Sequence, residues 1–400
     1  MRMVHKYGGS SVATIEQIRA IARHIADLRA QGHELVVVCS AMGKTTNGLI
    51  AMAQQITPTP SKRELDALMS TGEIQTVTLM AMALHSLGCD AVSMTGSQSG
   101  FITNDVHSRA FIKEVKAERI EQCLREGKVV VAAGFQGVTE GGDITTLGRG
   151  GSDTTAVALA AALGCSCDIY TDVDAVYTVD PRLYPAAKPL ARISYEEMME
   201  MSAHGAGVLE TRCVELAKKY GVELYVGRTL ETERKGTTVM SQEKILFEDM
   251  PITGISIKDN CTIVSFAPMD YAPEKVSAIF DIIAQNHINL DIINQNILGD
   301  KIAFSFSCPD AQAEELRAAL AKSPHHQGCQ PDIHSGYTQI SVVGVGMATH
   351  TGVASRVFGV LARAGIPYYQ ITTSEISISF TIDPANKGKA VAALGEAFDL

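Results

Sequence analysis

The chain has 400 residues, of which 34 are Lys or Arg and 44 are Asp or Glu, so that its net charge at pH 7 is −10. At roughly 100 to 200 residues per domain, this length predicts two to four domains, and the acidic balance argues against general binding to nucleic-acid phosphates. The sequence has no run of 18 apolar residues that would predict a membrane-spanning helix, and its hydrophobic content of 46% predicts a soluble globular protein.

From residue 1 to about residue 240, short apolar runs alternate with helical stretches. Strands are predicted at Val4 to Tyr7, Leu35 to Cys39, Asp90 to Met94, Lys128 to Ala133 and Asp168 to Thr171, and helices at Thr14 to Ala30 and Lys62 to Leu87. The strand runs are only four to six residues long and rich in Val and Ile, which is typical of strands buried on both faces. The pattern therefore predicts an α/β sandwich with a largely parallel sheet.

A polar stretch from Ser241 to Pro251 ends this pattern, and the sequence behind it repeats itself after 78 residues. Ile279-Phe280, Ile282-Ile283 and Ile288 recur as Val357-Phe358, Val360-Leu361 and Ile366. Each copy is predicted to begin as strand, helix, strand, strand, with strands at Thr262 to Phe266, Asn289 to Gln295, Gln339 to Val343 and Pro367 to Thr373. The repeat indicates two small α+β modules, which normally bind ligands or each other and seldom catalyse.

Two glycine-rich segments follow predicted strands and precede helices. In Lys6-Tyr7-Gly8-Gly9-Ser10, the paired glycines let the backbone approach a ligand, and loop amides beside a cation suit anionic oxygens. In Arg149-Gly150-Gly151-Ser152-Asp153, the guanidinium stands beside a helix N-terminus, where it favours a carboxylate or a phosphate. We expect Ser152 or Asp153 to cap that helix.

Other polar groups are expected to face the same cleft, because ligands bind at the carboxyl ends of strands in open α/β sheets. Ser40 and Thr46 follow the second strand, and Glu73 lies in the long helical region. The loop after the Asp168 strand combines acids, an aromatic ring and an arginine that suit nucleotide recognition, although such residues also occur in plain turns: Thr171, Asp172, Tyr177, Asp180 and Arg182.

The remaining sequence signals concern compartment and metals. Residues Met1 to Lys6 lack the apolar core of a signal peptide, and the nine cysteines are an odd number without a disulfide framework. These features predict a cytoplasmic protein with reduced thiols. Cys165 and Cys167 form the closest pair and lack metal-site spacing, so we expect no protein-held metal.

Taken in order, six motifs resemble those of the aspartate kinases in the amino-acid kinase superfamily, and the resemblance covers essentially the whole chain. They are Lys6-Tyr-Gly-Gly-Ser-Ser11, Cys39-Ser-Ala-Met-Gly43, Ser70-Thr-Gly-Glu73, Phe135-Gln-Gly137, Thr146-Leu-Gly-Arg-Gly-Gly-Ser-Asp-Thr-Thr155 and Tyr177-Thr-Val-Asp-Pro-Arg182. The C-terminal repeat, ending in Thr373-Ser-Glu-Ile376, resembles paired ACT domains. The implied fold is a three-layer kinase sandwich over residues 1–245, followed by ferredoxin-like βαββαβ modules over 250–330 and 335–400.

The resemblance implies ATP-dependent phosphorylation of L-aspartate to 4-phospho-L-aspartate, with Mg²⁺ held mainly by the phosphates. Lys6 and Asp153 would be catalytic, and the substrate would be held by Ser40, Thr46, Glu73, Arg149, Gly150, Gly151 and Ser152. The nucleotide would be held by Lys6, Tyr7, Gly8, Gly9, Ser10, Thr171, Asp172, Tyr177, Asp180 and Arg182. The family also implies a first step toward lysine, threonine and methionine.

Regulation and assembly are further expectations from the resemblance. Feedback inhibition by lysine, threonine or both would act through the ACT modules, with Asn289, Gln295, Ser374 and Glu375 in the effector region or in strand-end hydrogen bonds instead. A homo-oligomer is expected through exposed ACT sheet edges. Two alternatives remain open at this point: another kinase of the superfamily, and a non-catalytic amino-acid sensor.

Overall fold

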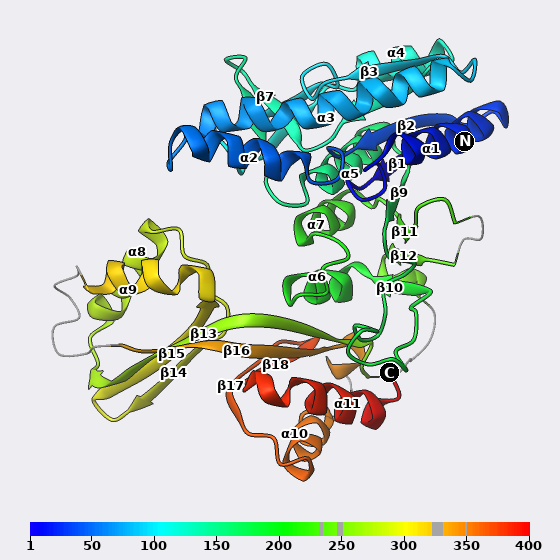
Figure 1. Ribbon diagram of the computed structural model, residues 1–400. Helices are drawn as coiled ribbons and strands as arrows, with labels where there is room; N and C mark the ends of the chain where they lie inside the picture. The colour runs from blue at the N-terminus through cyan, green and yellow to red at the C-terminus, as the bar shows by residue number, and fades with distance from the viewer. Residues whose placement is uncertain (232–234, 246–250, 322–330, 349) are drawn as a thin grey trace. The chain divides into compact units, whose positions relative to one another are not determined.

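A computed structural model describes residues 1–231, 235–245, 251–321, 331–348 and 350–400 (Figure 1). The chain forms two compact units. The first comprises Met1–Val176, Pro189–Met199 and Gly207–Leu246, and the second comprises Tyr177–Lys188, Glu200–Ala206 and Phe247–Leu400. The second unit therefore includes two segments that precede the predicted linker, and part of that linker, residues 246–250, lies outside the described residues. No helix among the described residues is long and apolar enough to span a membrane.

The first unit is built on an eight-stranded sheet with the strand order β10-β12-β11-β9-β1-β2-β6-β3. Every neighbouring pair is parallel except β11 with β12, which confirms the predicted fold class. The strands are β1 (Arg2–Tyr7), β2 (Glu34–Cys39), β3 (Ala91–Met94), β6 (Val129–Ala133), β9 (Ser166–Thr171), β10 (Arg192–Ser194), β11 (Leu224–Arg228) and β12 (Thr237–Met240).

Both faces of this sheet are buried, as the Val-rich runs predict. Val37 and its neighbours on one face pack in a core with α1 (Ile15–Ala30) and α3 (Lys62–His85), while Val36 and Val38 alternate with them and are fully buried as well. Helix α1 begins where expected, because the Thr14 hydroxyl accepts a hydrogen bond from the Gln17 N–H in a capping box. The other helices of this part of the chain are α2 (Thr45–Ile56), α4 (Glu118–Arg125), α5 (Gly151–Leu163), α6 (Tyr195–Ala203) and α7 (Thr211–Tyr220).

A smaller sheet, with the order β5-β4-β7-β8, was not predicted from the sequence. Its strands are three or four residues long and lack the apolar runs that mark the larger sheet. They are β4 (Phe101–Thr103), β5 (Ile112–Val115), β7 (Gln136–Thr139) and β8 (Ile144–Thr146). Strand β8 ends at the residue from which the Arg149 segment leaves the sheet.

In the second unit, the two copies of the repeat have the same order of elements, strand, helix, strand, strand, helix. The first copy consists of β13 (Gly254–Asp270), α8 (Pro273–Gln285), β14 (Ile293–Leu298), β15 (Lys301–Pro309) and α9 (Ala313–Ala321). The second consists of β16 (Pro331–Val343), α10 (Val353–Arg363), β17 (Tyr368–Thr373), β18 (Ser377–Ile382) and α11 (Lys387–Phe398). The strand predicted at Asn289 to Gln295 begins only at Ile293.

The two modules share their long central strands in one six-stranded sheet of order β14-β15-β13-β16-β18-β17. The start of β13 pairs with the end of β16, as in Ile257 with Ile340, and its end pairs with the start of β16, as in Val264 with Ile333. The side chains follow the same division, since Ile255 joins the core of the second module and Val264 that of the first. Each module thus completes its sheet with a strand segment from the other.

Candidate active site

The predicted motifs of the first unit meet at a cavity of about 510 Å³. In-register parallel pairing aligns Tyr7 with Cys39 and Cys39 with Ala133, so the loops after β1, β2 and β6 leave the sheet side by side. Ten residues assigned to the site from sequence line this cavity: Lys6, Gly9, Ser40, Thr46, Glu73, Arg149, Gly150, Gly151, Ser152 and Asp153.

An ion pair joins the first of the predicted motifs to the fifth. The Lys6 Nζ lies 2.7 Å from the Asp153 Oδ1, at ion-pair distance but without hydrogen-bond alignment. Lys6 is only 8% exposed, and a buried ammonium group requires such a partner to offset its lost hydration. Asp153 lies in the first turn of α5, where the helix dipole also favours a negative charge.

The start of α5 corrects the prediction that Ser152 or Asp153 caps this helix. The cap residue is Gly150, whose φ of +62° is a left-handed conformation that favours glycine. A Cβ at this position would lie 2.3 Å from the Cβ of Glu210, so the packing also requires glycine. With the helix starting at Gly151, both Ser152 and Asp153 lie inside its first turn and line the cavity.

Glu73 on α3 presents a buried carboxylate with one unused oxygen. Its side chain is 3% exposed, and Oε1 accepts a hydrogen bond of 3.1 Å from the Ala41 N–H. Oε2 has no hydrogen-bond partner among the described residues. Burial raises the pKa of Glu73 to about 7, against the weaker opposing effect of the Ala41 hydrogen bond. A cationic group entering the cavity would satisfy this carboxylate.

Arg149 supplies an open positive charge to the same cavity. It is exposed and makes no ion pair with any residue in the described ranges. The chain before it is held from α7, because the Arg212 guanidinium donates to the carbonyl oxygens of Leu147, at 3.1 Å, and Ala110, at 3.0 Å. Burial lowers the pKa of Arg212. The cavity therefore offers an open cation and an open carboxylate, which suit a small zwitterion.

Several predicted nucleotide residues do not line this cavity with their side chains. Tyr7 is a core residue, 1% exposed, whose ring stacks on Tyr170 at 5.2 Å between centroids. Gly8 donates its N–H to the Tyr170 carbonyl oxygen at 3.2 Å, and Ser10 is exposed. At the end of β9, the Thr171 hydroxyl donates to the Asp172 carboxylate at 3.0 Å.

The other predicted residues belong to the second unit. Tyr177, Asp180 and Arg182 lie in its Tyr177–Lys188 segment. Arg182 pairs with Asp180 at 2.7 Å, and its hydrogen bonds lower the pKa of that carboxyl group.

In the ACT region, Ser374 makes turn hydrogen bonds with Ser377. Asn289, Gln295 and Glu375 are exposed. These positions stay predictions as effector contacts.

Sequence reasoning missed residues that support the cavity without a local motif. Ser108 and Asn47 line it, and Asp66 and Arg212 hold the segments around it. One signal was present: Asp66 precedes Glu73 by seven residues, two helical turns, so the two carboxylates share one face of a helix.

Comparisons with known proteins identify the family of this chain. A model of the "Amino acid kinase family" matches residues 1–228, and an "ACT domain" model matches residues 340–398. An aspartokinase of Geobacillus stearothermophilus is 46% identical over 400 residues, covering 100% of this chain and 97% of that protein, and one of Bacillus sp. (strain MGA3) is 44% identical over 403 residues with the same coverage.

Two solved aspartokinase structures are similar to the whole of this chain. Escherichia coli aspartokinase III in complex with aspartate and ADP superposes with a TM-score of 0.83 at 24% identity, covering all of both chains, which supports the fold. Aspartate kinase from Synechocystis has a TM-score of 0.56 at 37% identity and covers 100% of this chain and 69% of that one.

The buried Glu73 carboxylate leads to a stability prediction. Because burial on folding raises the pKa of Glu73 from its ordinary value of 4.5 to about 7, ionisation costs the folded state free energy. The stability that the folded state gains from keeping Glu73 protonated is fully present below the pKa of the unfolded chain. It is lost as pH rises through about 7. The loss is on the order of 3 kcal/mol. Glu73→Gln, which keeps an acceptor for the Ala41 N–H, should therefore be more stable than the unsubstituted protein at pH 8.

The measurement is chemical denaturation of both proteins at pH 4.5 and pH 8 without ligands. The stability difference should be small at pH 4.5 and should favour the variant at pH 8. An equal difference at both pH values would contradict the raised pKa.

Proposed function

The chain belongs to the aspartokinases of the amino acid kinase family, and we propose that it transfers the γ-phosphoryl group of ATP to the side-chain carboxylate of L-aspartate, giving 4-phospho-L-aspartate and ADP. The observation that carries the assignment of the acceptor site is the cavity that pairs the open Glu73 oxygen with the open Arg149 guanidinium. Glu73 receives the α-ammonium group, and Arg149 binds the α-carboxylate. Ser40, Thr46, Gly150, Gly151 and Ser152 surround the acceptor.

The chemistry explains why the cavity needs no general base. The acceptor is a carboxylate that is already ionised at neutral pH, so the obstacle is repulsion between two anions. Lys6 offsets this repulsion at the transferring phosphoryl group, and Asp153 holds the Lys6 ammonium in place at 2.7 Å. Catalysis therefore consists mainly of positioning and charge neutralisation.

The nucleotide is held at the loop after β1 and the segment after β9. Gly8, Gly9 and Ser10 bring backbone groups to the phosphates, while Tyr7 contributes through its backbone, since its ring is in the core. Thr171, Asp172, Tyr177, Asp180 and Arg182 complete this part of the proposal.

Mg²⁺ fits this scheme as a phosphate-bound ion. Among the described residues, no group of three or more His, Cys, Asp or Glu side chains could hold a metal. When bound, the ion supplies charge neutralisation at the phosphate oxygens.

The ACT region supports feedback inhibition by lysine, threonine or both, in a homo-oligomer. Strands β14 and β17 form the two edges of the six-stranded sheet and expose apolar side chains, among them Ile293, Ile297 and Tyr369. Exposed apolar edges favour pairing with a second copy. Asn289, Gln295, Ser374 and Glu375 are the candidate effector contacts, and effector binding would shift the population toward a less active kinase unit.

The acceptor assignment predicts a clear substrate preference. ADP release by the full chain with ATP and Mg²⁺ should depend on L-aspartate and should be far slower with L-glutamate, whose extra methylene displaces the carboxylate from Lys6. Lys6→Ala should reduce kcat by roughly a hundredfold or more. Equal ADP release with L-aspartate, L-glutamate and no acceptor would contradict the assignment, as would an unchanged rate in Lys6→Ala.

The Glu73 pKa predicts the pH dependence of acceptor recognition. Only the ionised carboxylate attracts an ammonium group, so kcat/KM for L-aspartate should rise roughly fivefold between pH 6 and pH 7 and level off above. In Glu73→Gln this rise should disappear and kcat/KM should stay low throughout. A variant that retains the rise would show that another group is responsible.

The regulatory assignment predicts effector-dependent inhibition in an assembled protein. Activity should fall when lysine, threonine and meso-diaminopimelate are titrated singly and in pairs, with at least one condition inhibitory. Light scattering should report a dimer or larger. A monomer with and without effectors, or full activity under every condition, would contradict this part of the proposal.

A further inference from the structure

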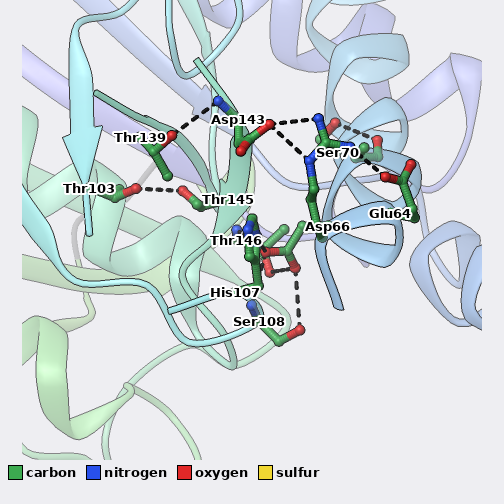
Figure 2. A network of polar contacts seen from close by, with 12 residues as sticks. Glu64, Asp66, Ser70, Thr103, His107, Ser108, Thr139, Asp143, Thr145 and Thr146 are labelled. Carbon is green, nitrogen blue, oxygen red and sulfur yellow. Dashed lines mark hydrogen bonds and ion pairs between the residues drawn. The ribbon is translucent and has the colours of Figure 1, made fainter. Parts of the chain in front are cut away.

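Asp66 is a fully buried carboxylate that has no role in the proposed chemistry. It lies on α3 with 0% exposure and accepts hydrogen bonds from the loop at Ser108 and from the end of strand β8 at Thr146, as Figure 2 shows. Its Oδ2 accepts from the Ser108 N–H at 2.9 Å and the Thr146 N–H at 3.1 Å, and lies 3.0 Å from His107 Nδ1. Its Oδ1 accepts from the Thr146 hydroxyl at 2.7 Å and the Ser108 hydroxyl at 3.3 Å. Together these contacts offset the cost of burying the charge.

Both segments held by Asp66 belong to the wall of the cavity. Ser108 and Thr146 line it, and Thr146 precedes Arg149 by three residues. The segments are also tied to each other, because the Ala110 N–H donates to the Thr146 carbonyl oxygen at 2.9 Å. Asp66 thus fixes the chain at the point from which the Arg149 loop leaves β8.

A second charge, which is half-buried, holds the same two segments from another helix. Arg212 on α7 donates to the carbonyl oxygens of Ala110 and Leu147. Asp66 accepts hydrogen bonds from N–H and hydroxyl groups of these two segments, and Arg212 donates hydrogen bonds to their carbonyl oxygens. The base of the loop is therefore fixed, while Arg149 itself is exposed. This arrangement suits a loop that must present its guanidinium at a defined place.

Helix α3 also carries Glu73, seven residues or about 10 Å further along. Helix α3 therefore positions Glu73, which would receive the substrate ammonium group, directly. Through Asp66 it also positions the base of the Arg149 loop. We infer that Asp66 is a positioning residue for acceptor recognition, which sets the separation between Glu73 and Arg149 that matches L-aspartate. The inference rests on the proposed function, because it concerns the same amino-acid site.

The test compares Asp66→Ala with a matched control in the same region of the molecule. Asp143 (Figure 2) also connects α3 to the smaller sheet, since Arg63 Nε donates to its Oδ1 at 2.9 Å, but this contact is exposed and neither residue lines the cavity. Asp66→Ala should raise KM for L-aspartate at least tenfold and leave KM for ATP within about threefold. Asp143→Ala should change neither constant.

Two milder substitutions keep the test valid if Asp66→Ala does not fold. Thr146→Val removes the shortest hydrogen bond without changing side-chain volume much and should raise KM for L-aspartate by a few fold. Asp66→Asn can still accept from both N–H groups through its oxygen, while the two hydroxyls turn to accept from its amide. It should therefore restore KM for L-aspartate to within about threefold of the original value.

Calorimetric titration of L-aspartate should show the same order of affinities in the folded variants. The inference is overturned if KM for aspartate and for ATP rise in proportion, if only thermal stability falls, or if Asp143→Ala has the same effect. Failure of the proposed function is a separate result, since the unsubstituted protein would then release no ADP in response to L-aspartate.

Discussion

The parallel register of the central sheet is the constraint on which the candidate site depends. Tyr7 of β1 pairs with Cys39 of β2 and with Tyr170 of β9, so the residues that follow these strands emerge at one edge. Lys6, Ser40 and the segment after β6 meet there although they are far apart in sequence. A slip of one residue in any pairing would turn the preceding side chains to the opposite face. The Val-rich strands are buried on both sides, so the strand ends that carry these loops are anchored in the core of the sheet.

The cavity contains the cationic side chains of Lys6 and Arg149, although the net charge of the whole chain is negative. A net charge of −10 is unfavourable for binding two anions. In the proposed function, the cavity offsets this through Lys6, which pairs with Asp153, and through Arg149, which makes no ion pair with any described residue, while the Glu73 carboxylate is kept for the ammonium group. Burial makes that carboxylate responsive near neutral pH. Its raised pKa is thus a cost in stability that accompanies the proposed binding of an ammonium group.

The sequence predicted best those elements whose structure follows from a local pattern of residues. Apolar runs located the strands of the larger sheet, and the 78-residue repeat located two modules of equal element order. The smaller sheet escaped prediction because strands of three or four residues carry no periodicity. The α5 cap was assigned to Ser152 or Asp153 because side-chain preference is visible in sequence, whereas the contact between Gly150 and Glu210 spans 60 residues. Asp66 was missed for the same reason, since its partners are 41 to 80 residues away.

The segment Tyr177–Lys188 belongs to the second unit although it precedes the predicted domain boundary, and this bears on the proposed regulation. The loop proposed to hold the nucleotide, Tyr177–Lys188, packs as part of the ACT-containing unit. There the Ile255 N–H donates to the Thr178 carbonyl oxygen at 2.7 Å, and Leu183 and Tyr184 pack against the core of the second module. Because β13 and β16 are shared, the two modules form one sheet and cannot rearrange independently. A change at either module would thus bear on the packing of this loop, which gives the proposed feedback inhibition a physical route that does not depend on the acceptor cavity.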